Sequence, residues 1–248
     1  MLYFFTRIAL IFNQINPGLR PRTDEQYHKM AEIWINKSSK FYEHQTLDVP
    51  FKVVLMYHPD NRHIIDSHTW PSYVEFTTDN NEIWLKNNVV RGSQIMVTRI
   101  DYDDSFATDI FAYMTSMKQQ LQQDTIIMYN KIRMYHIESG TFTSPMEHRS
   151  SMFISKYIHD FQPPESDDRN HPYYKFEPTS TSQVYGILGD HGKVYLKPHI
   201  KPDECYALCR LTGFNAANNI NLEKKLGLMG RDWRPYTISP PDPRFITG

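Results

Sequence analysis

The chain has 248 residues, of which 40% are hydrophobic and 22% are charged, and its formal net charge is −1 at pH 7. This composition is ordinary for a soluble globular protein. A net charge so close to zero gives no general case for binding nucleic acid or a membrane surface. The length allows one large α/β domain or two small domains.

The two cysteines, Cys205 and Cys209, are spaced to lie on one helix face and form no disulfide framework. We therefore expect a reducing compartment. The N-terminal run MLYFFTRIALIF is interrupted by Arg7, has no basic leader and is too short to span a bilayer. These features predict a cytoplasmic protein without a membrane span.

The first hundred residues alternate β-rich runs with a helical pattern. A strand is predicted at Leu2–Phe5, ending at Thr6 and Arg7, and a helix from Asp24 to about Glu43, capped by Thr23 or Asp24. Further strands are predicted within residues 51–60, 72–78 and 94–100. Helices that alternate with apolar strands indicate an α/β fold in which helices cover a sheet.

The second half of the chain is less regular. A helix is expected to begin after Asp104 or Ser105, which would cap it, because apolar residues follow at helical spacing. Strands are predicted at 125–137 and 192–197, an irregular loop at 159–178, a helix at 203–211 and an extended arm from Pro235.

An acidic cluster follows the strand predicted at 94–100. In VTRIDYDD, residues 97–104, the carboxylates of Asp101, Asp103 and Asp104 would repel one another at the carboxyl end of a strand. Ligands of open α/β sheets bind at that edge, and a hard cation such as Mg²⁺ or Mn²⁺ shared with a diphosphate would relieve the repulsion. Two other interpretations are helix capping and a metal site without nucleotide, such as a calcium loop or a nuclease centre.

The stretch VTRIDYDDSFATDIF resembles the signature of the rhamnosyltransferase-like glycosyltransferases. Four further stretches are similar to this family in the same order: YFFTR, IWINKSSKFYEHQTLDVPFKVVLMYHPD, SSMFISKY and CRLTGFNAANNI. The resemblance implies a GT-A-like, mixed and mostly parallel sheet flanked by helices, with irregular C-terminal acceptor-side segments. It also implies one domain over residues 1–248, with a nucleotide-binding part at about 1–120 and an acceptor-side part at about 121–248.

The resemblance also implies roles for individual residues. Asp101 would meet the ribose or the metal, while Asp103 and Asp104 would hold the metal that bridges the diphosphate. The residues implied in nucleotide-sugar binding are Thr6, Arg7, Arg99 and Asp101. Arg99 would also steady the acidic turn.

One position departs from the family pattern. Where the resemblance leads us to expect a histidine before Gly213, the chain has Thr212, so His191 becomes the candidate for a histidine metal ligand.

The function implied is a metal-dependent glycosyltransferase, either hexosyl or pentosyl, that uses Mn²⁺ or Mg²⁺. It would move a sugar from a nucleotide-sugar donor to a hydroxyl of a glycan or of a hydroxylated base in DNA. Candidates for the base that takes the acceptor proton are Asp190, Glu138 and Glu147. The alternatives are a metal-dependent hydrolase or nuclease, and a non-catalytic sugar-binding module of the same fold.

Overall fold

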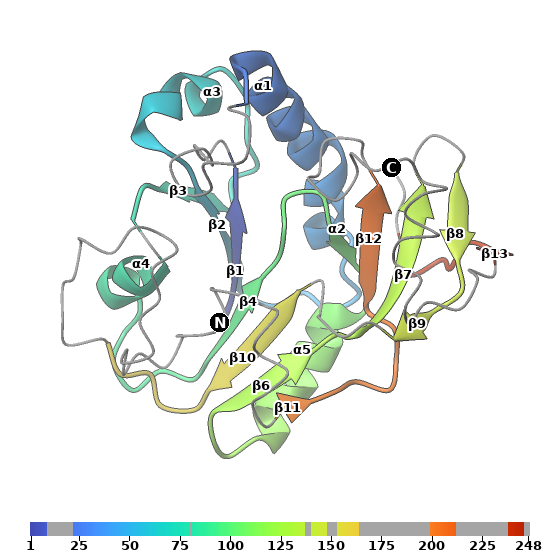
Figure 1. Ribbon diagram of the computed structural model, residues 1–248. Coiled ribbons are helices and arrows are strands. Elements are labelled where there is room, and N and C mark those ends of the chain that lie inside the picture. The colour runs from blue at the N-terminus through green and yellow to red at the C-terminus, as the bar shows by residue number, and fades with distance from the viewer. Residues whose placement is uncertain are drawn as a thin grey trace.

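A computed structural model of the chain describes residues 1–8, 22–79, 81–136, 140–147, 153–163, 199–211 and 238–245. Seven strands form the larger sheet, in the order β11-β6-β10-β4-β1-β2-β3 (Figure 1). Their bounds are β1 Leu2–Arg7, β2 Phe51–Met56, β3 Val74–Thr77, β4 Ile95–Arg99, β6 Thr125–Met128, β10 Ile154–Ile158 and β11 His199–Ile200. Every pairing is parallel except the two made by β10. The predicted mixed, mostly parallel sheet is therefore confirmed.

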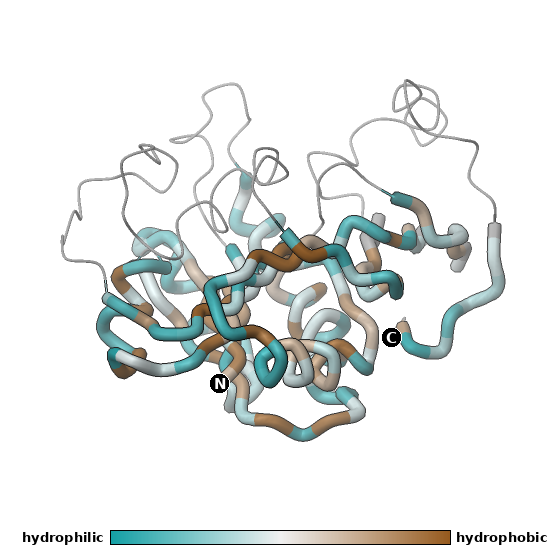
Figure 2. The backbone as a smooth tube through the Cα atoms, turned by 90° about the horizontal axis from the view of Figure 1, so that it is seen from below, coloured by the Kyte–Doolittle hydropathy of each residue, from teal (hydrophilic) through white to brown (hydrophobic). Residues whose placement is uncertain are grey.

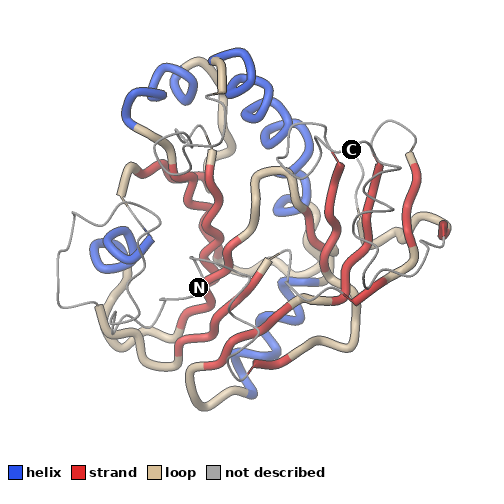
Figure 3. Tube along the Cα trace, in the orientation of Figure 1, coloured by secondary structure: helices blue, strands red, loops and turns tan. Residues whose placement is uncertain are grey.

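A smaller sheet stands beside the larger one, in the order β13-β8-β7-β12-β5, and β9 also pairs with β7 (Figure 3). Its strands are β5 Ser105–Phe106, β7 Lys131–His136, β8 Thr141–Thr143, β9 Met146–Glu147, β12 Ala207–Leu211 and β13 Ile238–Ser239. The chain that leaves β4 runs from the larger sheet into β5 of the smaller one. The segment 100–107 therefore joins the two sheets.

The described helical segments are α1 Asp24–Ile33, η2 Trp34–Ser38, α2 Ser39–Glu43, η3 Pro59–Asn61, α3 Arg62–Asp66, α4 Asn81–Asn88 and α5 Ile110–Gln120. The predicted helix at 24–43 is helical throughout, but η2 in its middle is a π-helical turn. Thr23 caps it as predicted, because its Oγ1 accepts the Gln26 backbone N–H while the Gln26 side-chain Oε1 accepts the Thr23 backbone N–H.

Apolar side chains cover both faces of the larger sheet. Successive residues of a strand point to opposite faces, so Phe4 packs in one cluster with residues of α1, α2 and α5, while Tyr3 and Phe5 pack against Trp84 of α4. The ring centroids of Phe4 and Phe106 lie 5.5 Å apart, and the Phe4 ring also contacts the rings of Tyr42 and Phe111. Figure 2 shows that apolar and polar stretches alternate along the described chain. Burial on both faces is typical of parallel sheets.

Two predicted elements are wrong. Residues 203–211 form no helix, because Ala207–Leu211 is strand β12, paired with β5 and β7. Ser105 does not cap a helix but begins β5, and α5 starts only at Ile110. The run 125–137 is β structure as predicted, divided into β6 and β7 in different sheets. The strand predicted at 192–197 lies outside the described residues.

Within the described residues, no helix combines the length and the hydrophobicity that a bilayer span requires.

Candidate functional site

The strand order of the larger sheet reverses between β1 and β4. From β1 the chain adds β2 and β3 on one side, and then places β4 on the other side of β1. The two strands are parallel, with Phe5 opposite Arg99, and the Ile100 backbone N–H donates to the Phe5 carbonyl at 3.1 Å. In open α/β sheets, ligands bind beyond the carboxyl ends of the strands at such a switch point. Arg7 ends β1 at this place and Arg99 ends β4.

The acidic cluster leaves β4 at this switch point as a tight turn. The Asp104 backbone N–H donates to the Asp101 carbonyl at 3.3 Å, which closes the turn. Asp103 is 0% exposed and Asp104 is 3% exposed. The Asp101 side chain is 41% exposed. Asp101 is therefore the carboxylate of the three that solvent, and hence a ligand, reaches most readily.

Arg99 and Asp101 form an ion pair at the end of β4. Arg99 Nη2 lies 3.5 Å from Asp101 Oδ1, and the arginine side chain is nearly buried while the aspartate is partly open. Because the Asp101 side chain is partly exposed, water screens the ion pair, and the pair adds little to the stability of the fold.

Two hydroxyls bind the backbone of the acidic segment, which we define as residues 100–107. Thr6, at 1% exposure, donates from Oγ1 to the Ile100 carbonyl and so joins the ends of β1 and β4. Ser38 Oγ, from η2, donates to the Tyr102 carbonyl at 2.7 Å. The Thr6 hydroxyl thereby supports the segment that carries the aspartates, and its contact with the nucleotide stays a prediction.

A glutamine side chain fixes the far end of the acidic segment. Gln45 Nε2 donates to the Phe41 carbonyl at 2.6 Å and to the Ala107 carbonyl at 3.2 Å. Its Oε1 accepts the Phe111 backbone N–H at 3.1 Å, in the first turn of α5. Gln45 therefore serves as a distant cap for a helix whose own N-cap residue makes no side-chain cap bond. Gln45 belongs to a stretch on which the family resemblance rests. Its position in the sequence did not indicate the contacts with Ala107 and Phe111, which lie 62 and 66 positions away.

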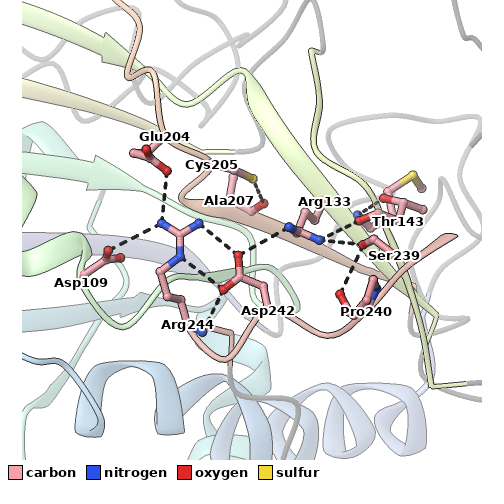
Figure 4. A network of polar contacts seen from close by, with 11 residues as sticks. Asp109, Arg133, Thr143, Glu204, Cys205, Ala207, Ser239, Pro240, Asp242 and Arg244 are labelled. Carbon is pink, nitrogen blue, oxygen red and sulfur yellow. Dashed lines mark hydrogen bonds and ion pairs between the residues drawn. The ribbon is translucent and has the colours of Figure 1, made fainter. Parts of the chain in front are cut away.

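An ion network holds the start of α5 to the C-terminal segment (Figure 4). Arg244 lies 3.0 Å from Asp242 and 3.6 Å from both Asp109 and Glu204, and Arg133 lies 3.6 Å from Asp242. The Arg244 carbonyl also accepts the Thr108 backbone N–H at 2.9 Å.

The same network sets the ionisation of its central carboxylate. Burial alone would raise the pKa of Asp242, but the hydrogen bonds and charge of Arg244 and the charge of Arg133 lower this pKa below its ordinary value. The sequence predicted only an extended arm here, and Asp109, Arg133 and Glu204 are too distant in the chain from Asp242 and Arg244 for any spacing to reveal the network.

The acidic turn fits only one kind of metal site. Over the described ranges, no three His, Cys, Asp or Glu side chains come close enough together to hold a metal ion. Mg²⁺ needs no such cage, since one or two carboxylates, water and substrate phosphates usually complete its shell. The oxygen donors at Asp101 therefore fit a hard cation shared with a bound diphosphate, and they do not fit a metal centre built from protein alone.

The other candidate residues lie elsewhere. Glu147 is exposed in β9, opposite Lys131 of β7 in the smaller sheet. Glu138, Asp190 and His191 lie outside the described residues. The choice of a catalytic base therefore stays a prediction.

No protein-family model matches the sequence, and no curated protein matches it either. Among solved structures the chain is similar to TarS 1-349 of S. aureus, with 11% identity and a TM-score of 0.40 over 86% of this chain and 62% of that one. Two further crystal structures of TarS 1-349 are in complex with UDP (TM-score 0.39, 11% identity, 86% of this chain and 61% of that chain) and with UDP-GlcNAc (TM-score 0.39, 12% identity, 85% and 58%). The chain thus spans about three fifths of those structures. TM-scores below 0.5 establish no shared fold, so the function proposed for the chain rests on its own strand order and acidic turn.

Proposed function

We propose that the protein is a glycosyltransferase that takes its sugar from a nucleotide-sugar donor, with Mg²⁺ or Mn²⁺ at the acidic turn. One observation carries this proposal: the acidic turn follows β4 at the switch point of a mostly parallel sheet, beside the end of β1. A carboxylate partly open to solvent at that edge suits a diphosphate held through a cation. On this proposal the larger sheet is the nucleotide-binding sheet of a GT-A-type enzyme.

The residues of the site have distinct proposed tasks. Asp101 would hold the cation or a ribose hydroxyl, with Arg99 restricting its direction, and Arg7 would place positive charge beside the nucleotide. Asp103 and Asp104, which are buried within the turn, are proposed to hold the cation that bridges the diphosphate. A bound divalent cation supplies electrostatic stabilisation of the charge that develops on the leaving diphosphate.

An acceptor hydroxyl must lose its proton to a nearby base, for which Asp190, Glu138 and Glu147 are the proposed candidates and His191 a further metal ligand. We propose a glycan or a hydroxylated DNA base as acceptor and the cytoplasm as the location.

Thermal unfolding with nucleoside diphosphates tests the proposal. UDP, GDP, ADP and CDP would each be added with Mn²⁺, and each component alone, at about 100 times the dissociation constant. Such binding stabilises by about 2.7 kcal/mol, which is roughly 5 to 10 °C for a chain of this size. We expect one or more diphosphates to give this shift only when Mn²⁺ is present.

Two variants make the test specific to the acidic turn. Asp101→Asn removes the charge at nearly constant shape and should abolish the combined shift. Asp66→Asn is the matched control, because Asp66 is also an exposed aspartate paired with an arginine, Arg62 at 2.8 Å. Stabilisation by Mn²⁺ alone would favour a hydrolase or nuclease instead, and no stabilisation by any combination would contradict the proposal.

A further inference from the structure

The helix that follows β1 contains an unusual turn opposite the acidic segment. The Ser39 backbone N–H donates to the Trp34 carbonyl, five residues back, so the turn Trp34–Ser38 is π-helical. Short π-helical turns inside α-helices are rare and are found frequently at functional sites. Ser38 ends this turn and is buried.

Two adjacent serines in this helix use their hydroxyls differently. Ser39 Oγ donates to the Ile35 carbonyl at 2.5 Å, which is the usual bond of a helical serine to the preceding turn. Ser38 Oγ instead leaves the helix and donates to the Tyr102 carbonyl at 2.7 Å, across 64 positions of the sequence. The two residues share chemistry and burial, but only the Ser38 bond reaches the acidic segment.

The carbonyl that Ser38 binds belongs to the stretch of backbone that carries the three aspartates. Tyr102 stands between Asp101 and Asp103, and a hydrogen bond to its carbonyl fixes the peptide plane that connects Tyr102 to Asp103. Fixing that plane also limits the directions in which the flanking side chains can leave the backbone. Sites work when the supporting residues hold the binding groups within a fraction of an ångström.

We propose that Ser38 is a positioning residue for the acidic turn: through the Tyr102 carbonyl, it orients the aspartates that hold the cation to which the diphosphate binds. This inference rests on the proposed function for its effect on nucleotide binding. Its effect on the turn itself does not depend on that function. Ser38 is 3% exposed, so it acts through the Tyr102 carbonyl and the π-helical turn serves to present its hydroxyl.

The test compares Ser38→Ala with Ser38→Thr, which keeps a hydroxyl, and with Ser39→Ala, the matched control. Hydrogen exchange is measured for the Asp104 amide, whose bond to the Asp101 carbonyl closes the turn. Loss of a buried hydrogen bond is worth about a factor of ten, so Ser38→Ala should speed this exchange about tenfold. Ser39→Ala should leave it unchanged, and Ser38→Thr should restore slow exchange.

Titration of the same variants with Mn²⁺ and UDP, GDP, ADP or CDP gives the second readout. We expect Ser38→Ala to bind about three- to tenfold more weakly than wild type, and Ser39→Ala to bind as wild type. Equal Asp104 exchange in the two alanine variants would overturn the inference, as would equal nucleotide affinity.

The experiment distinguishes failure of the proposed function from failure of the role given to Ser38. If wild type binds none of the diphosphates, the proposed function fails, and the exchange rates still decide whether Ser38 holds the turn. If Ser38→Ala does not fold, Ser38→Cys keeps the size of the side chain with a much weaker donor and is subject to the same criteria.

Discussion

The two ends of the parallel strands β1, β2 and β4 are built differently. Their amino ends border a cavity of about 410 Å³. It is lined by Met1, Leu2, Val49, Pro50, Gln94, Thr115, Lys118, Gln119, Leu121 and Gln122. No aspartate or glutamate is among these lining residues. The carboxyl ends of β1 and β4 instead meet a segment with three aspartates, whose backbone accepts hydrogen bonds from Thr6, Ser38 and Gln45.

This difference indicates that the cavity at the amino ends of the strands need not be the nucleotide-binding site. Burying a carboxylate costs free energy. The fold nevertheless buries Asp103 and Asp104 and holds the backbone around them with hydrogen bonds, so the conformation of that segment is well defined. The side chains around the amino-end cavity are mainly apolar or uncharged polar groups. We therefore place nucleotide binding at the carboxyl ends, and the following experiments test that assignment.

The largest effect on stability is expected at Gln45. Gln45→Ala removes three hydrogen bonds to the backbone groups of Phe41, Ala107 and Phe111. At about 1 kcal/mol each, with some exposure of the freed groups to water, the free energy of unfolding should fall by about 2 to 4 kcal/mol. Urea unfolding measures this loss. A decrease in the free energy of unfolding of less than about 0.5 kcal/mol would show that the Gln45 hydrogen bonds do not stabilise the connection between α5 and the acidic segment.

A smaller loss is expected at Thr6. Thr6→Val keeps the shape of the side chain but leaves the buried Ile100 carbonyl without the Thr6 hydroxyl. An unsatisfied buried group costs about 1 to 3 kcal/mol, so urea unfolding should show a loss in that range. Thr6→Ser should retain most of the stability, since it keeps the hydroxyl. Equal losses in both variants would point to packing instead of the hydrogen bond.

A pH effect of moderate size is expected where α1 meets the segment after α3. His28 Nδ1 and His68 Nε2 lie 3.0 Å apart, so one ring must be neutral to accept the hydrogen bond. Burial, together with the charge of His28, lowers the pKa of His68 below 6.5, and Glu32 opposes this. The unfolded chain then binds more protons than the folded chain below that pH, so stability should fall as the pH falls from about 7 to about 5.

Urea midpoints at the two pH values check this effect. Ser67 and Trp70 also face the pair, but neither titrates in this range. His68→Gln should therefore reduce the difference in stability between the two pH values. An unchanged difference would assign the pH dependence to other groups.

The smallest effect is expected at the amino-end cavity. Lys118 is the basic side chain in its lining, and Lys118→Ala should leave nucleotide affinity within about twofold of wild type. Titration with Mn²⁺ and the diphosphate that binds provides the check. A large loss would move the nucleotide to the opposite end of the sheet and refute the assignment.

Local patterns revealed those elements whose signals are local. The apolar runs that became β1, β2 and β4, the Thr23 cap and the position of the acidic turn after β4 all depend on residues close in sequence. Ser105 and Phe106 appeared to begin a helix because their strand partners, Leu208 and Ala207, come a hundred positions later. The same pairing explains why Ala207–Leu211, within the expected helix at 203–211, forms a strand. Strand formation depends on such distant neighbours more than helix formation does.

The candidate site divides in the same way. The three aspartates and the two arginines at strand ends were visible as a sequence pattern, because strand ends and charges are local features. The supporting donors Ser38 and Gln45 were not, since a π-helical turn has no sequence signature that we recognise, and both bonds span more than sixty positions.

A crystal structure with Mn²⁺ and whichever of UDP, GDP, ADP or CDP stabilises the protein would locate the nucleotide. We expect an anomalous Mn²⁺ signal in contact with Asp101 and with the diphosphate, beyond the ends of β1 and β4. Nucleotide bound in the cavity beside Lys118, or a diphosphate held without contact to the acidic turn, would contradict it.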